Sequence, residues 1–188
     1  MLEGRLVRLR PLEPSDAERC YRWLNDQEVV GNLIALRYPI SMAYEERFLR
    51  DRPPFDFASG GILAIETKDG RHIGTTSFYD VRPEDRKAAL AITIGEKACW
   101  SKGYGADTVV TMLRFAFHEM HLHRVWLTTV EYNQRAIACY TKCGFREEAR
   151  LRQDVYRHGR YWDFVSMAIL RDEFDALHNT KEEANVGR

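Results

Sequence analysis

Apolar residues recur at strand-like spacing in some segments and at helical spacing in others, and the two kinds alternate along the chain. Residues 7–10 predict a short first strand. A capping box that begins at Ser15 predicts a helix behind it. The apolar positions of that helix are Ala17, Cys20, Tyr21 and Leu24. Ser41 is expected to cap a second helix, which a Pro-Pro pair ends.

Three β-rich runs follow, over residues 61–67, 72–81 and 88–95. Asp69-Gly70 lies between the first two runs, and this pair favours a tight hairpin turn. A short polar loop separates the second run from the third. We therefore predict an antiparallel meander of three strands.

A glycine-containing turn after the meander is followed by apolar residues at helical spacing, then by a β-rich run over residues 124–130. The apolar positions of this helix are Ala106, Val109, Val110, Leu113 and Phe117. A strand, a helix and a strand in this order predict a right-handed crossover, so the run at 88–95 and the run at 124–130 should form a parallel pair.

The last third of the chain predicts one short helix and two more strands. The helix is expected to start at Asn133 and to end at Gly144, where glycine allows a left-handed conformation. Two strands should flank a turn at His158-Gly159. The polar residues 178–188 predict a disordered tail, which leaves residues 1–177 as a single domain.

Composition excludes several classes of protein. The 188 residues include 28 basic and 28 acidic side chains, so the formal net charge is +0 and a polyanionic partner such as nucleic acid is not expected. The start of the chain is charged where a signal peptide would be apolar, and no segment has the length of a membrane span. We therefore expect a cytoplasmic protein with no membrane partner.

The four cysteines lack the paired spacing of a zinc site, and no metal is expected. They are Cys20, Cys99, Cys139 and Cys143. Buried, reduced thiols are the simplest interpretation. Cys139 and Cys143 lie one helical turn apart, which permits a redox or metal pair, although nothing in the sequence supplies further ligands.

The turn WSKGYGAD, residues 100–107, lacks the full pattern of a Walker loop or of a dinucleotide-binding fingerprint. The turn can still bind an anion in a more general way, because successive backbone amides at the start of a helix favour a negative charge. Those amides belong to Lys102, Gly103, Tyr104, Gly105 and Ala106. The turn alone is equally compatible with a purely structural role.

A second segment, NQRAIACYTKCGF, changes this balance. It resembles the N-x-x-A-x-x-x-Y-x-x-x-G-F segment of the GNAT superfamily of N-acetyltransferases. The turn WSKGYGAD resembles the pyrophosphate-binding turn of the same superfamily. The opening LVRLRPLEPSDAE, the ending HGRYWDFVSMAILRDEF and Trp100 are similar to the branch that contains ribosomal-protein N-terminal and spermidine acetyltransferases. Trp100 departs from the Gln or Arg of the wider superfamily.

The resemblance implies a mixed, α+β-like α/β fold: a largely antiparallel central sheet, with a parallel pair splayed at the cofactor site, flanked by helices. It also implies acetyl transfer from acetyl-CoA to a primary amine, with coenzyme A as product, by direct attack in a ternary complex. Pantetheine would bind the backbone of Ile92, Thr93 and Ile94, and the pyrophosphate would bind residues 102–106. Asn133 would contact pantetheine, and Tyr140, beside the sulfur, would act as the general acid.

The general base and the acceptor stay open. Glu96 and Glu131 follow the two splayed strands, and Glu28 is a third candidate. The acceptor could be a peptide or protein N-terminus, such as that of a ribosomal protein, or a polyamine or related small amine. Acidic residues that could attract a polycation are Glu45, Glu46 and Asp51, and aromatic residues that could line an acceptor cleft or a core are Phe55 and Phe57.

Two other functions are compatible with parts of the pattern. A catalytically silent acyl-CoA sensor would keep the cofactor groove without the chemistry, which the presence of Tyr140 disfavours. A ribosome- or nucleic-acid-associated scaffold would need a basic stripe that the sequence lacks. A homodimer is one oligomeric state left open.

Overall fold

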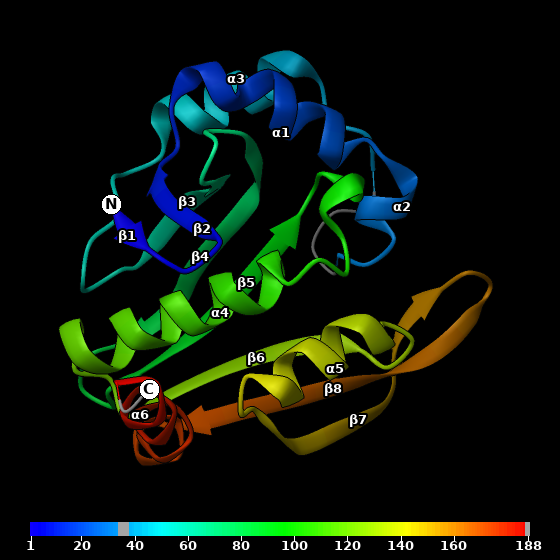
Figure 1. The fold of residues 1–188 in the computed structure, drawn as a ribbon. Helices are drawn as coiled ribbons and strands as arrows, with labels where there is room; N and C mark the ends of the chain where they lie inside the picture. Colours follow the sequence, from blue (N-terminus) through cyan, green and yellow to red (C-terminus); the bar gives the residue numbers. More distant parts are fainter. Residues whose placement is uncertain (34–37, 187–188) are drawn as a thin grey trace.

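The computed structural model describes residues 1–33 and 38–186, and the strands form one sheet in the order β1-β2-β3-β4-β5-β6-β8-β7. The strands are β1 Leu2–Glu3, β2 Val7–Pro11, β3 Gly61–Thr67, β4 His72–Arg82, β5 Lys87–Ile94, β6 Arg124–Val130, β7 Arg146–Arg157 and β8 Arg160–Leu170. All neighbours pair antiparallel except β5 and β6, which are parallel. The predicted meander, crossover and mixed sheet are confirmed (Figure 1).

The helices are α1 Ala17–Leu24, α2 Gln27–Val30, α3 Met42–Asp51, α4 Tyr104–Arg114, α5 Gln134–Lys142 and α6 Arg171–Val186. Short 3-10 turns lie at Pro14–Asp16 and Lys97–Cys99, and one π-helical turn, Phe115–Glu119, extends α4. Ser41 caps α3 as predicted, because its hydroxyl accepts a hydrogen bond from the Tyr44 amide at 3.1 Å. The described helices include no segment long and apolar enough to cross a membrane.

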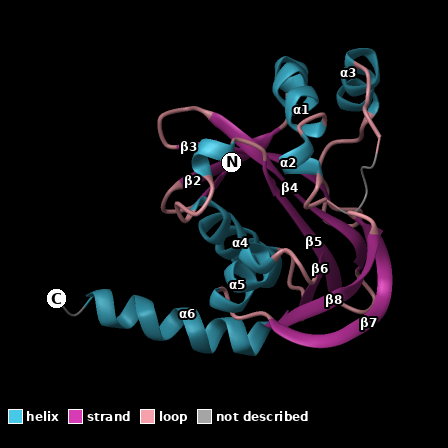
Figure 2. Ribbon diagram, turned by 90° about the vertical axis from the view of Figure 1, so that its right-hand side faces the viewer, coloured by secondary structure: helices cyan, strands magenta, loops and turns pink. Residues whose placement is uncertain are grey.

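Helices cover both faces of the sheet, as Figure 2 shows. Alternate residues of β3 point to opposite faces, so Leu63 and Ile65 pack with α4 in the larger core, while Ala64 packs with α1 and α3 in a smaller one. The larger core includes the α4 residues Val109, Met112 and Leu113. The apolar face predicted for this helix is therefore the face that holds it on the sheet.

The last helix, α6, continues to Val186, and residues 187–188 lie outside the described part. The disordered tail at residues 178–188 stays a prediction. Lys181, Glu182, Glu183 and Ala184 are good helix formers, and they extend a helix that is already nucleated at Arg171. The single domain at residues 1–177 stays a prediction.

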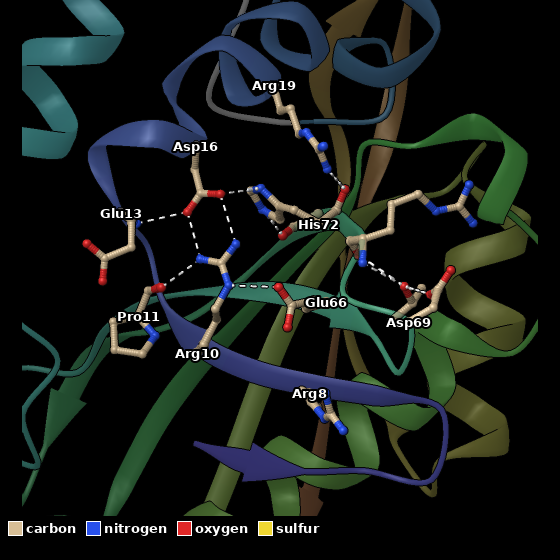
Figure 3. A network of polar contacts seen from close by, with 12 residues as sticks. Arg8, Arg10, Pro11, Glu13, Asp16, Arg19, Glu66, Asp69 and His72 are labelled. Atoms are coloured by element: carbon tan, nitrogen blue, oxygen red, sulfur yellow. Dashed lines mark hydrogen bonds and ion pairs between the residues drawn. The ribbon is translucent and has the colours of Figure 1, made fainter.

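The start of α1 differs from the prediction, because Asp16 and not Ser15 organises it (Figure 3). The carboxylate of Asp16 accepts two hydrogen bonds from Arg10, at 2.8 and 2.9 Å, and one from the Glu13 amide at 2.8 Å. His72 Nδ1 lies 2.9 Å from the same carboxylate. Asp16 is only 5% exposed, so it joins α1 to β2 and β4 from within the protein.

We expect Asp16→Ala to lower the free energy of unfolding by about 3 kcal/mol, because it leaves the Arg10 guanidinium without its main partner. Urea denaturation followed by circular dichroism measures the change. Ser15→Ala is the matched control, and it should change stability by less than about 0.5 kcal/mol. A larger loss for Ser15→Ala than for Asp16→Ala would restore the capping role that the sequence assigns to Ser15.

Candidate active site

The parallel strands β5 and β6 pair over only three positions, Lys87 with Arg124, Ala88 with Val125, and Ala89 with Trp126. Beyond these pairs β5 continues to Ile94 and stays paired with β4, while β6 continues to Val130 and stays paired with β8. The two strands therefore diverge toward their carboxyl ends, as Figure 1 shows. Beyond this point no strand of the described residues pairs with the edge that β5 turns toward β6, so this edge can bind an extended ligand.

The predicted pantetheine-binding residues Ile92, Thr93 and Ile94 lie on the diverging part of β5. They are half-buried, whereas Ala88, Ala89 and Leu90, which precede the divergence or lie at its start, are buried. The exposure of the strand thus rises where its pairing with β6 stops. This is the expected environment of a backbone edge that accepts a ligand from solvent.

The glycine turn presents unpaired amides beside this edge. Gly103 has φ 88°, a left-handed conformation that favours glycine, and α4 begins at the next residue. The first helical hydrogen bond runs from the Asp107 amide to the Gly103 carbonyl at 3.0 Å. The amides of Tyr104, Gly105 and Ala106 precede it, and no side chain in the described part of the chain caps this helix end. The turn therefore offers partial positive charge to an anion.

Three segments converge at this turn. A β-carbon at Gly105 would lie 3.8 Å from Cys139 Sγ and 4.0 Å from Ile94 Cγ1, so the start of α4 touches both α5 and the end of β5. The Trp100 indole donates a hydrogen bond to the Ile94 carbonyl at 2.7 Å. The Arg135 guanidinium lies 3.8 Å from the centre of the Trp100 ring. The glycine turn, the end of β5 and the helix α5, which carries Tyr140 and is capped by Asn133, therefore lie next to one another.

Two contributors to this arrangement were missed in the sequence. Arg135 is exposed in the first turn of α5, where a cation interacts unfavourably with the helix dipole. This unfavourable position is the signal in the sequence that could have indicated a role for Arg135 other than stabilising the helix. Asp107 accepts hydrogen bonds from the amides of Leu6 at 2.6 Å and Val7 at 3.0 Å. These contacts hold the start of α4 against β2, and they join residues about a hundred positions apart.

Tyr140 lies on α5 and is 9% exposed, with its ring centre 5.9 Å from that of Phe145. Burial raises the pKa of the Tyr140 phenol well above its usual range, and the neighbouring Cys139 and Cys143 add to this effect. The phenol is therefore protonated at neutral pH. Asn133 caps α5 as predicted, since its Oδ1 accepts a hydrogen bond from the Ala136 amide at 3.2 Å.

The three candidate bases differ in the hydrogen bonds and ion pairs of their carboxylates. Glu131 is engaged at both carboxylate oxygens, because it accepts from the Asp163 amide at 2.9 Å and lies 3.4 Å from the Arg150 guanidinium. Glu28 is exposed and paired with Lys97. Neither carboxylate is available as a proton acceptor without losing an ion pair or a hydrogen bond.

Glu96 is half-buried, and no hydrogen bond or ion pair of its side chain occurs within the described residues. Its backbone is nevertheless held firmly. The amides of Gly95 and Glu96 both donate to the Ile73 carbonyl, at 2.9 and 3.1 Å. A β-carbon at Gly95 would lie 2.1 Å from the Trp23 ring, so glycine is needed for α1 to pack directly beside Glu96.

The short helix α2, which the sequence did not predict, spans the two diverging strands. Lys97, just after β5, pairs with Asp26 at 2.9 Å at the start of α2. Tyr132, just after β6, donates from its hydroxyl to the Gly31 carbonyl at 2.5 Å at the end of α2. The Tyr132 ring also lies edge-on to Trp162, with ring centres 4.9 Å apart. α2 is thus attached on both sides of the divergence.

Two of the acidic residues predicted to attract a polycation, Glu46 and Asp51, are exposed on α3, and their role stays a prediction. Glu45 is 2% exposed, so it is not on the surface where it would attract a polycation. Phe55 packs against Phe115, with ring centres 5.8 Å apart, and Phe57 lies 5.7 Å from the same ring. Phe115 follows the carboxyl end of α4, at the opposite end of that helix from the glycine turn. Phe55 therefore has the packing role, because it lies against the larger core, whereas Phe57 is 60% exposed.

Comparison with known proteins gives a consistent result. A family model described as an acetyltransferase (GNAT) domain matches residues 6–146. An uncharacterized N-acetyltransferase, YokL of Bacillus subtilis, is 25% identical over 93% of this chain and 96% of its own length. Spermidine N(1)-acetyltransferase of Vibrio cholerae is 27% identical over 88% of this chain and 94% of its own length. The crystal structure of a Vibrio cholerae spermidine N-acetyltransferase with CoA and spermine superposes with a TM-score of 0.75 at 22% identity, over 90% of this chain and 98% of that one.

Proposed function

The chain belongs to the GNAT acetyltransferases, which transfer an acetyl group from acetyl-CoA to an amine, and we propose that it does so by direct attack in a ternary complex between β5 and β6. The observation that carries this proposal is the early end of the β5–β6 pairing beside an uncapped helix start. An extended ligand with an anionic group fits both features at once. Acetyl-CoA has this form, with pantetheine for the strand edge and pyrophosphate for the amides.

The residues around the divergence then have separate roles. The backbone of Ile92, Thr93 and Ile94 would bind pantetheine, and one of these amides would donate to the thioester carbonyl. The amides of residues 102–106 would hold the pyrophosphate, with Arg135 supplying a full positive charge nearby. Asn133 would keep its amide nitrogen for pantetheine, because its oxygen caps α5.

Two proton transfers complete the reaction. Tyr140 would donate to the departing thiolate, and its raised pKa keeps the phenol protonated until that step. Glu96 is our choice of base, acting directly or through a water, because its carboxylate is the candidate without a hydrogen-bond or ion-pair partner among the described residues. Glu131 and Glu28 would instead hold the strand ends and α2 in place.

For the acceptor we propose a primary amine, of a polyamine or of a peptide N-terminus, that approaches beside α2. Relatives named as spermidine acetyltransferases support the first class. A ribosomal-protein acceptor, a homodimer and a cytoplasmic location stay predictions. The acyl-CoA sensor is the second candidate, and the protonated Tyr140 on α5, the helix that lies against the cofactor turn, favours the enzyme over it.

Two measurements test this proposal. Acetyl-CoA at about 100 times its Kd should stabilise the protein by about 2.7 kcal/mol and raise the Tm by several degrees. A screen for free coenzyme A should then show release with at least one acceptor among polyamines, amino acids, aminoglycosides and short peptides. Stabilisation without release for any acceptor would favour the sensor. No stabilisation would contradict the cofactor assignment itself.

A further inference from the structure

His72, the first residue of β4, is only 3% exposed and has no role in the proposed reaction. Its Nδ1 lies 2.9 Å from the Asp16 carboxylate, and its Nε2 lies 2.8 Å from the Gly74 carbonyl. Arg19 donates to the His72 carbonyl at 3.2 Å (Figure 3), and the Trp23 ring lies edge-on to the imidazole, with ring centres 4.9 Å apart. Asp16, Arg19 and Trp23 are three and four residues apart, so one face of α1 holds His72.

The start of β4 in turn holds the end of β5. The ladder between these strands ends at the pair of Gly74 with Ile94. Gly95 and Glu96 lie beyond this pair, and their amides donate to the Ile73 carbonyl at 2.9 and 3.1 Å. Ile73 directly follows the buried histidine in the chain. The backbone of the candidate base is therefore attached to the residue next to the imidazole.

Trp23 makes a second connection between the same two places. A β-carbon at Gly95 would lie 2.1 Å from the Trp23 ring, so this ring lies directly against the backbone before Glu96. The edge contact between Trp23 and His72 involves the same ring. His72 is thus connected to Glu96 through the backbone of β4 and through a packed side chain.

We propose that His72 is a positioning residue for Glu96. It fixes the Ile73 carbonyl and the Trp23 ring, and these fix the place of Glu96 after β5. General-base catalysis depends on that place, because a proton is transferred only within hydrogen-bond reach, directly or through one water. The inference rests on the proposed function, in which Glu96 is the base.

Cofactor binding should depend less on His72 than catalysis does. The pantetheine-binding residues 92–94 lie within the β4–β5 ladder, whereas Gly95 and Glu96 lie beyond its last pair. Loss of the imidazole contacts should therefore displace the base before it displaces the cofactor edge. A lower kcat with unchanged affinity for acetyl-CoA is the expected result.

His72→Phe keeps an aromatic ring beside Trp23 and removes both ring nitrogens. We expect kcat to fall at least about 10-fold, with the Kd for acetyl-CoA within about 3-fold. His72→Gln keeps a donor for the Gly74 carbonyl and should recover most of the rate. Phe174→Leu is the matched control, because Phe174 is 1% exposed and packs on Phe117, beyond the far end of α4. It should lower the Tm and keep kcat.

A double-mutant cycle separates positioning from general destabilisation. In the Glu96→Gln protein, His72→Phe should lower kcat by less than about 2-fold, because the group that it positions is already lost. A full loss in that background would overturn the proposal, since His72 would then act independently of Glu96. A wild-type kcat in His72→Phe would also overturn it.

Amide hydrogen exchange tests the positioning without relying on catalysis. The Glu96 amide should exchange at least about 10-fold faster in His72→Phe, while the protected amides of β6 keep their rates. Unchanged protection of Glu96 would overturn the proposal. If the wild type releases no coenzyme A with any acceptor, or if Glu96→Gln keeps the full rate, the proposed function fails on that result. The exchange rates still decide whether His72 holds the end of β5.

Discussion

Replacing Tyr140 with Phe is expected to lower kcat about 100-fold or more while the affinity for acetyl-CoA stays within about 2-fold. The change removes the hydroxyl and keeps the ring that packs near Phe145. Without this proton donor the thiolate must leave unprotonated or wait for water. Coenzyme A release at saturating substrates measures kcat, and calorimetric titration measures the affinity.

The raised pKa of Tyr140 adds a pH dependence to the same prediction. Because the phenol ionises only well above its usual pKa near 10, its deprotonation should not reduce kcat of the wild type at pH 9 to 10. Any rise of rate with pH below that range would report deprotonation of the amine or of its base. A fall of kcat near pH 8 that disappears in Tyr140→Phe would contradict the assigned environment.

Tyr161→Phe is the matched control, because Tyr161 is 62% exposed on β8 and makes its ring contact with Tyr156 at the surface. Its kcat should equal that of the wild type. If Tyr140→Phe also keeps the full rate, the thiolate receives its proton from another source. An equal loss of cofactor affinity and of rate would instead indicate a packing role for Tyr140.

The sequence predicts most of the sheet, because period-two runs and turn pairs are local signals. Ser41 could be assigned as a cap from its neighbours alone, and the hydrogen bond to Tyr44 confirms it. The role of Ser15 could not be assigned in this way. Asp16 organises the start of α1 instead, because its carboxylate binds Arg10 and lies beside His72, on two strands of the sheet. A capping pattern contains only neighbouring residues, so it gives no information about such tertiary partners.

The same distinction applies to the candidate site. The parallel pair follows from the order of elements, but the place where it stops, after Ala89 and Trp126, depends on the twist and packing of the whole sheet. The four-residue helix α2 is too short for a periodic pattern, and tertiary contacts to Lys97 and Tyr132 hold it. Glu131 and Glu96 look equivalent at strand ends, and the contacts of Glu131 with the Asp163 amide and with Arg150, both distant in sequence, separate them.

Replacing Gly105 with Val is expected to weaken acetyl-CoA binding at least about 100-fold, a loss of about 2.7 kcal/mol, with little change in stability. The protein has room for the added β-carbon, because among the described residues it would lie at ordinary contact distance from Cys139 and Ile94. Gly105 also has helical backbone geometry, unlike Gly103, whose φ of 88° would add strain to any substitution. The branched side chain should instead displace the anion from the amides of the α4 start.

Titration calorimetry measures the affinity of Gly105→Val, and thermal unfolding confirms that the fold is kept. Gly105→Ala should show a smaller loss, since one methyl group fills less of the space. Ala138→Val is the matched control, because it adds a β-branched side chain at an exposed position of α5 adjacent in sequence to Cys139. Wild-type affinity in Gly105→Val would remove the turn from the cofactor site, whereas a graded loss from Ala to Val would indicate that the space beside this glycine is where the pyrophosphate binds.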